Sequence, residues 1–184
     1  SHGGHGDVSA GDGNGGGGGG EGRVLVRPNV VTFTAACSSW ARSSHPHAAR
    51  RAQKLLDRAA ALWRSGEYPD ARPNAYMYNA VITAWSRSRE RGAAARAAAL
   101  LDAMADMHDE AGGPDDLRPD ARCYNIAINA VARSREPGCA DRARSLLERM
   151  ERLHDSGPHP LLLPDSLTFG AIINAYANDR GDSR

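Results

Sequence analysis

The stretch PNAYMYNAVITAWSRSR, residues 73–89, decides the fold because three other stretches of the chain match it. They read PNVVTFTAACSSWARSS from Pro28, PDARCYNIAINAVARSR from Pro119 and PDSLTFGAIINAYANDR from Pro164. The four copies are offset by 45, 46 and 45 residues. Self-similarity at such a constant period is the signature of a repeat protein.

A second block follows each of the first three copies. It reads RAQKLLD from Arg51, RAAALLD from Arg96 and RARSLLE from Arg142. Each block begins 18 residues after the aromatic residue of the first block, which is Phe33, Tyr78 or Tyr124. Two blocks that keep one register across three copies exclude an accident of composition, so the repeat is real.

Both blocks show the periodicity of a helix with one apolar face. In the second copy, Tyr78, Val81, Ile82 and Trp85 stand at positions i, i+3, i+4 and i+7. An Asn or Asp follows each proline, where a helix N-cap is preferred; these residues are Asn29, Asn74, Asp120 and Asp165. Antiparallel helix pairs are predicted at 30–43 with 47–64, 75–88 with 93–108 and 121–135 with 139–154, followed by a single helix at 166–178. We also expect Trp40, Trp85 and Tyr176 to lie in the core.

Two antiparallel helices cannot bury their apolar faces alone, so neighbouring pairs must stack. The sequence therefore predicts an all-α, right-handed helix-hairpin solenoid (an α-α superhelix) of three complete repeats and one half repeat. This helical-repeat domain spans residues 28–184, and the unpaired apolar face expected on its last helix indicates truncation at the C-terminus. Residues 1–27 contain a run of glycines that offers nothing to bury, and we expect a disordered linker there.

Composition narrows the classes of function. The chain has 23 basic and 22 acidic residues, a formal net charge of +1, so bulk charge does not mark a polyanion partner. No window holds the roughly 18 consecutive apolar residues of a membrane span, and we expect no membrane partner. Three cysteines without zinc-ligand spacing indicate neither a disulfide scaffold nor a metal site. Motifs such as a nucleophile elbow or a phosphate-binding glycine loop are missing, so we expect no enzyme activity and no cofactor.

The units resemble the pentatricopeptide repeat family, whose units open with V-T-Y-N-x-x-I, continue with E-A-x-x-L-F and close with P-D or P-N. The stretches VVTFTAAC, AYMYNAVI, ARCYNIAI and SLTFGAII look like this opening, and the second blocks are similar to the second-helix stretch. The Leu-Gly pair typical of tetratricopeptide repeats is missing. The resemblance covers residues 28–180, although units of 45–46 residues are longer than is usual in the family.

The resemblance implies an adaptor that binds single-stranded RNA, one base per repeat, and guides RNA processing, stability or translation in mitochondria or plastids. In the family, the residue after the helix aromatic and the residue after the closing proline choose the base together. The base-reading pairs would be Thr34 with Asn74, Asn79 with Asp120, and Asn125 with Asp165. A Thr–Asn pair implies adenine and an Asn–Asp pair implies uracil. The residues flanking the bases would be Val31, Tyr76, Arg122 and Leu167.

A stripe of polar residues on the first helix of each repeat also favours RNA binding. Asn79, Thr83 and Arg87 stand at i, i+4 and i+8, and the copies before and after repeat this spacing. Asn and Thr are poor residues inside a helix, whereas an amide or hydroxyl reads the edge of a splayed base. An arginine two turns further on reaches a phosphate, which assigns phosphate contacts to Arg42, Arg87 and Arg133.

Purely structural roles for the residues assigned to RNA stay open as alternatives. The residues after each proline suffice as helix caps, the stripe can be solvated or bond between helices, and the arginines suit helix C-termini. For the function, the alternatives are a protein–protein scaffold that holds a peptide on the concave face, and the RNA-binding arm of a larger RNA-processing enzyme. The sequence leaves the oligomeric state and the target transcript open.

Overall fold

The computed structural model describes residues 27–113, 115–155 and 162–179, so nearly all of the expected linker, residues 1–26, lies outside the described part. The described residues form seven α-helices and no strand. The helices are α1 (Val30–Arg42), α2 (Ala48–Arg64), α3 (Ala75–Arg87), α4 (Ala93–Glu110), α5 (Ala121–Ser134), α6 (Cys139–Asp155) and α7 (Ser166–Asn178), with the 3-10 helices η1 (Pro69–Ala71) and η2 (Asp115–Leu117). The all-α prediction is confirmed, and every predicted helix is present with its ends shifted by at most two residues.

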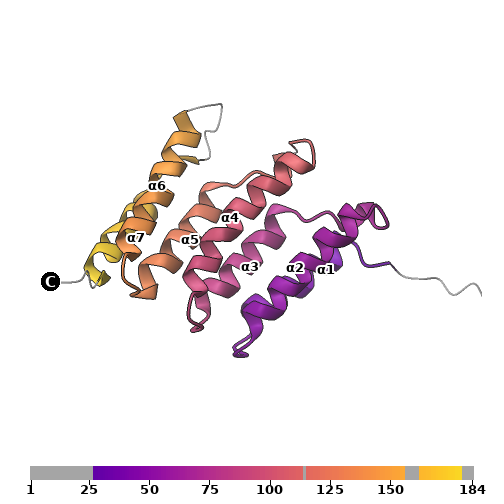
Figure 1. Ribbon diagram of the computed structural model, residues 1–184, viewed down its shortest axis with the longest axis horizontal. Helices are drawn as coiled ribbons and strands as arrows, with labels where there is room; N and C mark the ends of the chain where they lie inside the picture. Colours follow the sequence, from indigo (N-terminus) through magenta and orange to yellow (C-terminus); the bar gives the residue numbers. More distant parts are fainter. Residues whose placement is uncertain (1–26, 114, 156–161, 180–184) are drawn as a thin grey trace, which may run out of the picture.

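The helices form a repeat-like arrangement of two rows (Figure 1). Helices α1, α3, α5 and α7, which we call the first helices, pack against one another in chain order. Helices α2, α4 and α6, the second helices, each pack against the first helix before and the first helix after them. Figure 1 shows the short turns after α1, α3 and α5 along its lower edge and the loops after α2 and α4 along its upper edge. The molecule therefore has two distinct edges.

The residue after each proline caps a first helix, as the sequence predicts. A side-chain oxygen of each capping residue accepts a hydrogen bond from the backbone N–H three residues on, at 2.9–3.0 Å. The capping residues are Asn29, Asn74, Asp120 and Asp165. Each such cap stabilises its helix by about 1 kcal/mol. The capping interpretation is confirmed at all four positions.

In the first two repeats, an arginine–tryptophan contact connects the first block with the second. The guanidinium group of Arg96 lies 4.8 Å from the centre of the Trp85 ring, and that of Arg51 lies 4.9 Å from the Trp40 ring. The arginine that opens a second block therefore stacks on the tryptophan of its own first helix, a cation–π contact. In the third repeat a valine, Val131, replaces the tryptophan, and this stacking is lost.

The predicted apolar faces form the core, with one exception. Trp85 is 1% exposed and Trp40 is half-buried, whereas Tyr176 is 52% exposed. The prediction that Tyr176 lies in the core is therefore wrong. Helix α7 packs on α5 and α6 through its other side, and no described helix covers the side that carries Phe169, Ile173 and Tyr176.

Candidate functional site

The first helices line a groove of about 720 Å³ between α3, α5 and the start of α7. Its wall contains six residues that the sequence assigns to RNA: Arg87, Arg122, Asn125, Arg133, Asp165 and Leu167. Two residues of the polar stripe, Thr83 and Asn129, line it as well. The structure thus brings the third predicted unit together in one place: the base-reading pair, both flanking residues and one phosphate-contacting arginine.

Asn125 and Asp165 lie within hydrogen-bonding distance of each other. The Nδ2 atom of Asn125 donates to the two carboxylate oxygens of Asp165 at 3.3 and 3.4 Å. The buried hydroxyl of Thr168 lies between them, 2.6 Å from Oδ1 of Asn125 and 3.0 Å from Oδ1 of Asp165. This hydroxyl also accepts a hydrogen bond from the Asp165 backbone N–H at 3.0 Å. The capping box of α7 therefore holds the pair in place.

The pair is held in position and still has free bonding capacity. An amide offers two N–H donors and two oxygen lone pairs. Asn125 uses one of its donors on Asp165 and one lone pair on Thr168, which leaves one of each for a ligand. The pKa of the Asp165 carboxyl is lowered, first by the backbone N–H of Thr168 and then by its hydroxyl. Asp165 therefore stays charged near neutral pH and serves only as an acceptor.

The second pair has a thiol in place of the hydroxyl. Cys123 has the position in α5 that Thr168 has in α7, and its buried thiol lies 3.9 Å from the thioether sulfur of Met104. Burial raises the pKa of Cys123 to about 12, and the Asp120 carboxylate adds to this effect. A thiol is a weak donor and a weak acceptor. Oδ1 of Asn79 is buried without a hydrogen-bond partner.

The first pair is not joined. Met77 has the equivalent position in α3, and its thioether donates no hydrogen bond. Among the described residues no hydrogen bond connects Thr34 with Asn74, and the buried Thr34 hydroxyl has no partner. A buried polar atom left unpaired costs roughly 1–3 kcal/mol. The Thr34 hydroxyl and Oδ1 of Asn79 are therefore the two polar atoms of these pairs that are buried without a hydrogen-bond partner in the described part of the chain.

The predicted flanking residues form an exposed row. Val31, Tyr76 and Leu167 are 69%, 74% and 67% exposed although they are large hydrophobic residues, and Arg122 is exposed too. All four stand in the first turn of a first helix. Arg122 and Leu167 line the groove, whereas Val31 and Tyr76 lie outside it. Their exposure excludes a role in the core.

The arginines predicted to contact phosphates differ in their surroundings. Arg87 donates from Nη1 to the carbonyl oxygen of Ala41 in α1 at 3.1 Å. Asn178, at the equivalent position of α7, donates to the carbonyl oxygen of Ala132 in α5 at 3.2 Å. The position thus connects successive first helices, which is a structural role. The exposed side chains of Arg42 and Arg133 make no hydrogen bond or ion pair within the described part of the chain.

Acidic residues that sequence reasoning missed link each repeat to the one before it. Glu136, which follows α5, accepts a hydrogen bond from the backbone N–H of Gly92 at the start of α4, at 3.2 Å. Asp179, which follows α7, accepts from the backbone N–H groups of Gly138 and Ala140 at the start of α6, at 3.2 and 3.0 Å. A carboxylate at a helix N-terminus also interacts favourably with the helix dipole.

The first member of this set has a different partner. Glu90, which follows α3, forms an ion pair with Arg50 of α2 at 2.6 Å and lies 4.0 Å from Nδ1 of His47. The sequence signal for all three acids was present: each follows the end of a first helix within three residues. The repeat alignment alone does not reveal it, because the third acid is displaced by two positions.

The described residues place no three His, Cys, Asp or Glu side chains together as a metal site. Their helices also include none with the length and apolar character needed to traverse a bilayer. Comparison with known protein families, with curated proteins and with solved structures finds nothing that matches this chain.

Proposed function

We propose that the chain is a right-handed solenoid of pentatricopeptide-type repeats that binds single-stranded RNA along its first helices. The observation that supports this best is the convergence of Asn125, Asp165, Arg122, Leu167 and Arg133 on one groove. An amide for a base edge, two side chains that flank a ring and a cation for a phosphate together complement one nucleotide.

The resemblance implies uracil for the third unit, and the free groups of Asn125 are compatible with it. The Watson–Crick edge of uracil presents a ring N–H beside a carbonyl oxygen. The amide of Asn125 keeps one lone pair and one N–H free, which complement these two neighbouring groups. Asp165 and Thr168 fix the orientation of the amide, so its donor and acceptor keep their places when the base arrives.

The same resemblance supports the biological part of the proposal. We propose an adaptor without catalytic activity of its own, acting in the processing, stability or translation of transcripts in a mitochondrion or plastid. The direct test of its molecular function is binding of labelled oligo(U), oligo(A) and oligo(C) RNA, measured by fluorescence anisotropy.

The decisive variant is Asn125→Ala. It should reduce the preference for oligo(U) over oligo(A), because a good amide–base pair contributes about 1–3 kcal/mol of discrimination on the scale known for DNA. Ser145→Ala, which removes an exposed hydroxyl of α6 outside the groove, should leave the preference unchanged. Equal affinity of the native chain for all three RNAs would contradict base reading, and binding to none of them would favour a peptide scaffold.

A further inference from the structure

The net charge of +1 conceals a strongly basic edge. The turns that connect each first helix to its second helix, residues 42–51, 87–96 and 133–142, lie along one side of the molecule, which we call the turn edge (Figure 1). These segments contain ten arginines and only three acidic residues. The arginines are Arg42, Arg50, Arg51, Arg87, Arg89, Arg91, Arg96, Arg133, Arg135 and Arg142.

The opposite edge has the reverse balance. Its described acidic residues are Glu67, Asp70, Asp106, Glu110, Asp116, Asp120, Glu151, Asp155 and Asp165, against Arg27, Arg64, Arg72, Arg118, Arg122 and Arg152. Two of these arginines are already neutralised, Arg64 by Glu110 at 2.7 Å and Arg72 by Asp116 at 2.9 Å. The charge balance therefore favours the turn edge over the opposite edge for the backbone of a polyanion.

The acidic residues of the turn edge leave most of its arginines unneutralised. Glu90 binds Arg50, and Glu136 binds the Gly92 backbone N–H and Arg142, the latter at 3.3 Å. Eight arginines of this edge form no ion pair within the described residues; Arg51 and Arg96 stack on tryptophan rings, and the other six are Arg42, Arg87, Arg89, Arg91, Arg133 and Arg135. A guanidinium group stays charged in proteins and presents several donors that match phosphate oxygens.

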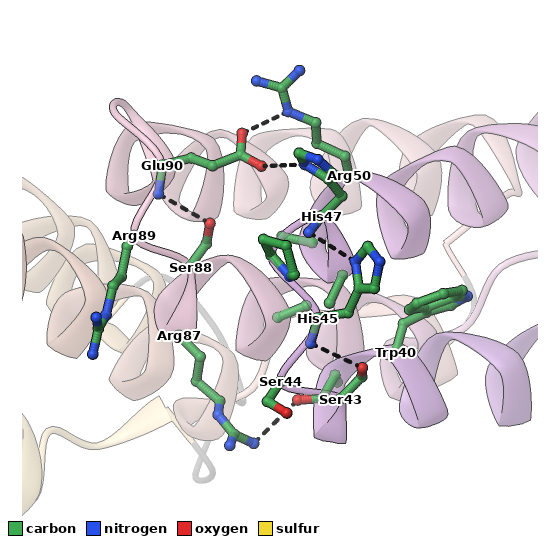
Figure 2. A pocket seen from close by; sticks show the side chains of 15 residues that line it. Trp40, Ser43, Ser44, His45, His47, Arg50, Arg87, Ser88, Arg89 and Glu90 are labelled. Carbon is green, nitrogen blue, oxygen red and sulfur yellow. Dashed lines mark hydrogen bonds and ion pairs between the residues drawn. The ribbon is translucent and has the colours of Figure 1, made fainter.

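Two hollows related by the repeat open on the turn edge. The first, of about 660 Å³, is lined by Arg50, Arg87, Arg89 and the histidines His45 and His47, among others. Figure 2 shows the carboxylate of Glu90 facing His47 and Arg50, while Arg87 and Arg89 extend away from it. The second hollow, of about 520 Å³, has Arg87, Arg89, Arg91 and Arg133 in its wall. Each hollow therefore combines concave shape with several cationic donors.

The hollows are continuous with the groove. Arg87 lines the groove and both hollows, and Arg133 lines the groove and the second hollow. We propose that the turn edge is a phosphate-binding track: RNA whose bases enter the groove passes Arg87 and Arg133, and its backbone continues through the two hollows. This inference rests on the proposed RNA binding and adds a sequence-independent contact outside the base-reading positions.

The test removes three arginines that line no part of the groove and make no contact that a substitution would break. The edge variant combines Arg89→Gln, Arg91→Gln and Arg135→Gln. Its affinity for oligo(U), oligo(A) and oligo(C) should fall by the same factor, with the base preference kept. The slope of log K against log salt should decrease by up to about 2, since each phosphate contact on a single strand contributes about 0.7.

The matched control removes the same charge elsewhere. Lys54→Gln, Arg58→Gln and Arg152→Gln replace three exposed cations without an ion pair in the described part, all outside the turn edge. This variant should keep a salt slope close to that of the native chain. An equal decrease in both variants, or a native slope in the edge variant, would overturn the phosphate track.

The outcomes also separate the two proposals. If Asn125→Ala abolishes the uracil preference while the edge variant keeps the native slope, the groove binds RNA and the turn edge does not. If the edge variant lowers the slope while the native chain shows no base preference, the turn edge binds RNA and base reading is wrong. Absence of RNA binding by the native chain would overturn both.

Discussion

Replacing Thr168 by valine tests whether the α7 cap holds the base-reading amide. The substitution keeps the shape of a fully buried side chain and removes the hydroxyl that bridges Asn125 and Asp165. Two partners lose their hydrogen bonds, Oδ1 of Asn125 and the backbone N–H of Asp165. The cap from the Asp165 carboxylate to the Thr168 backbone N–H remains, so α7 should still form.

The magnitude follows from these two bonds. At about 0.5–1.5 kcal/mol each, their loss should lower the free energy of unfolding by roughly 1–3 kcal/mol. In a domain of this size, each kcal/mol of lost stability lowers Tm by about 2–4 °C, so we expect Tm to fall by roughly 2–12 °C. Thermal unfolding followed by far-UV circular dichroism measures it. Thr168→Ser, which keeps the hydroxyl and loses one methyl group worth about 0.8 kcal/mol, is the control.

A double-mutant cycle with Asn125→Ala isolates the bridge itself. Because Thr168 and Asn125 share a hydrogen bond, their effects on stability should be coupled by about 1 kcal/mol, within the 0.5–3 kcal/mol range of contacting pairs. Thr168→Val should also weaken the preference for oligo(U), since the amide is no longer oriented. Additive effects of the two substitutions, together with an unchanged base preference, would refute the reasoning.

Three other predictions concern titration, thiol reactivity and the links between repeats. Because the pKa of Asp165 is lowered on folding, its contribution to stability is complete above the ordinary aspartate pKa of about 3.9 and is lost as the pH falls through the lowered value. Asp165→Asn should therefore flatten the acid limb of the Tm–pH profile, and an unchanged limb would contradict this. Burial raises the pKa of Cys37 and Cys123 to about 12, so both thiols should resist iodoacetamide until the chain unfolds, as mass spectrometry would show; rapid alkylation of the native chain would be inconsistent. Asp179→Ala should cost about 1–2 kcal/mol and accelerate amide hydrogen exchange at the start of α6, and native exchange rates there would rule out the cap.

Local features of the chain were predictable from the sequence, whereas contacts between repeats mostly were not. The caps at Asn29 and Asn74 involve residues only three positions apart, so their sequence pattern predicts them directly. The bridge through Thr168 and the links from Glu136 and Asp179 depend on how closely one repeat packs on the next. That distance is not encoded in any single segment.

Dependence on contacts between repeats also explains why the burial of Tyr176 was predicted wrongly and why the three base-reading pairs differ. Tyr176 aligns with Trp85, yet it is exposed, because burial depends on a covering helix and not on the residue itself. Repeat alignment also treats the three base-reading pairs alike. The structure distinguishes them by one aligned residue, which is a methionine, a cysteine or a threonine at Met77, Cys123 and Thr168.

The acidic residues that follow α5 and α7 mean that the structural unit of this chain differs from its sequence repeat. Glu136 belongs to the third helix pair but completes the N-terminus of α4 in the second, and Asp179 does the same for α6. A segment excised at a proline, where the sequence repeat begins, would leave the last of its second helices without this acceptor. We therefore expect the smallest transplantable unit to be three helices long, a pair and the first helix of its successor through the acid. Chimeric arrays joined just after Glu136 or Asp179 should retain the melting behaviour of their parents better than arrays joined at Pro119 or Pro164.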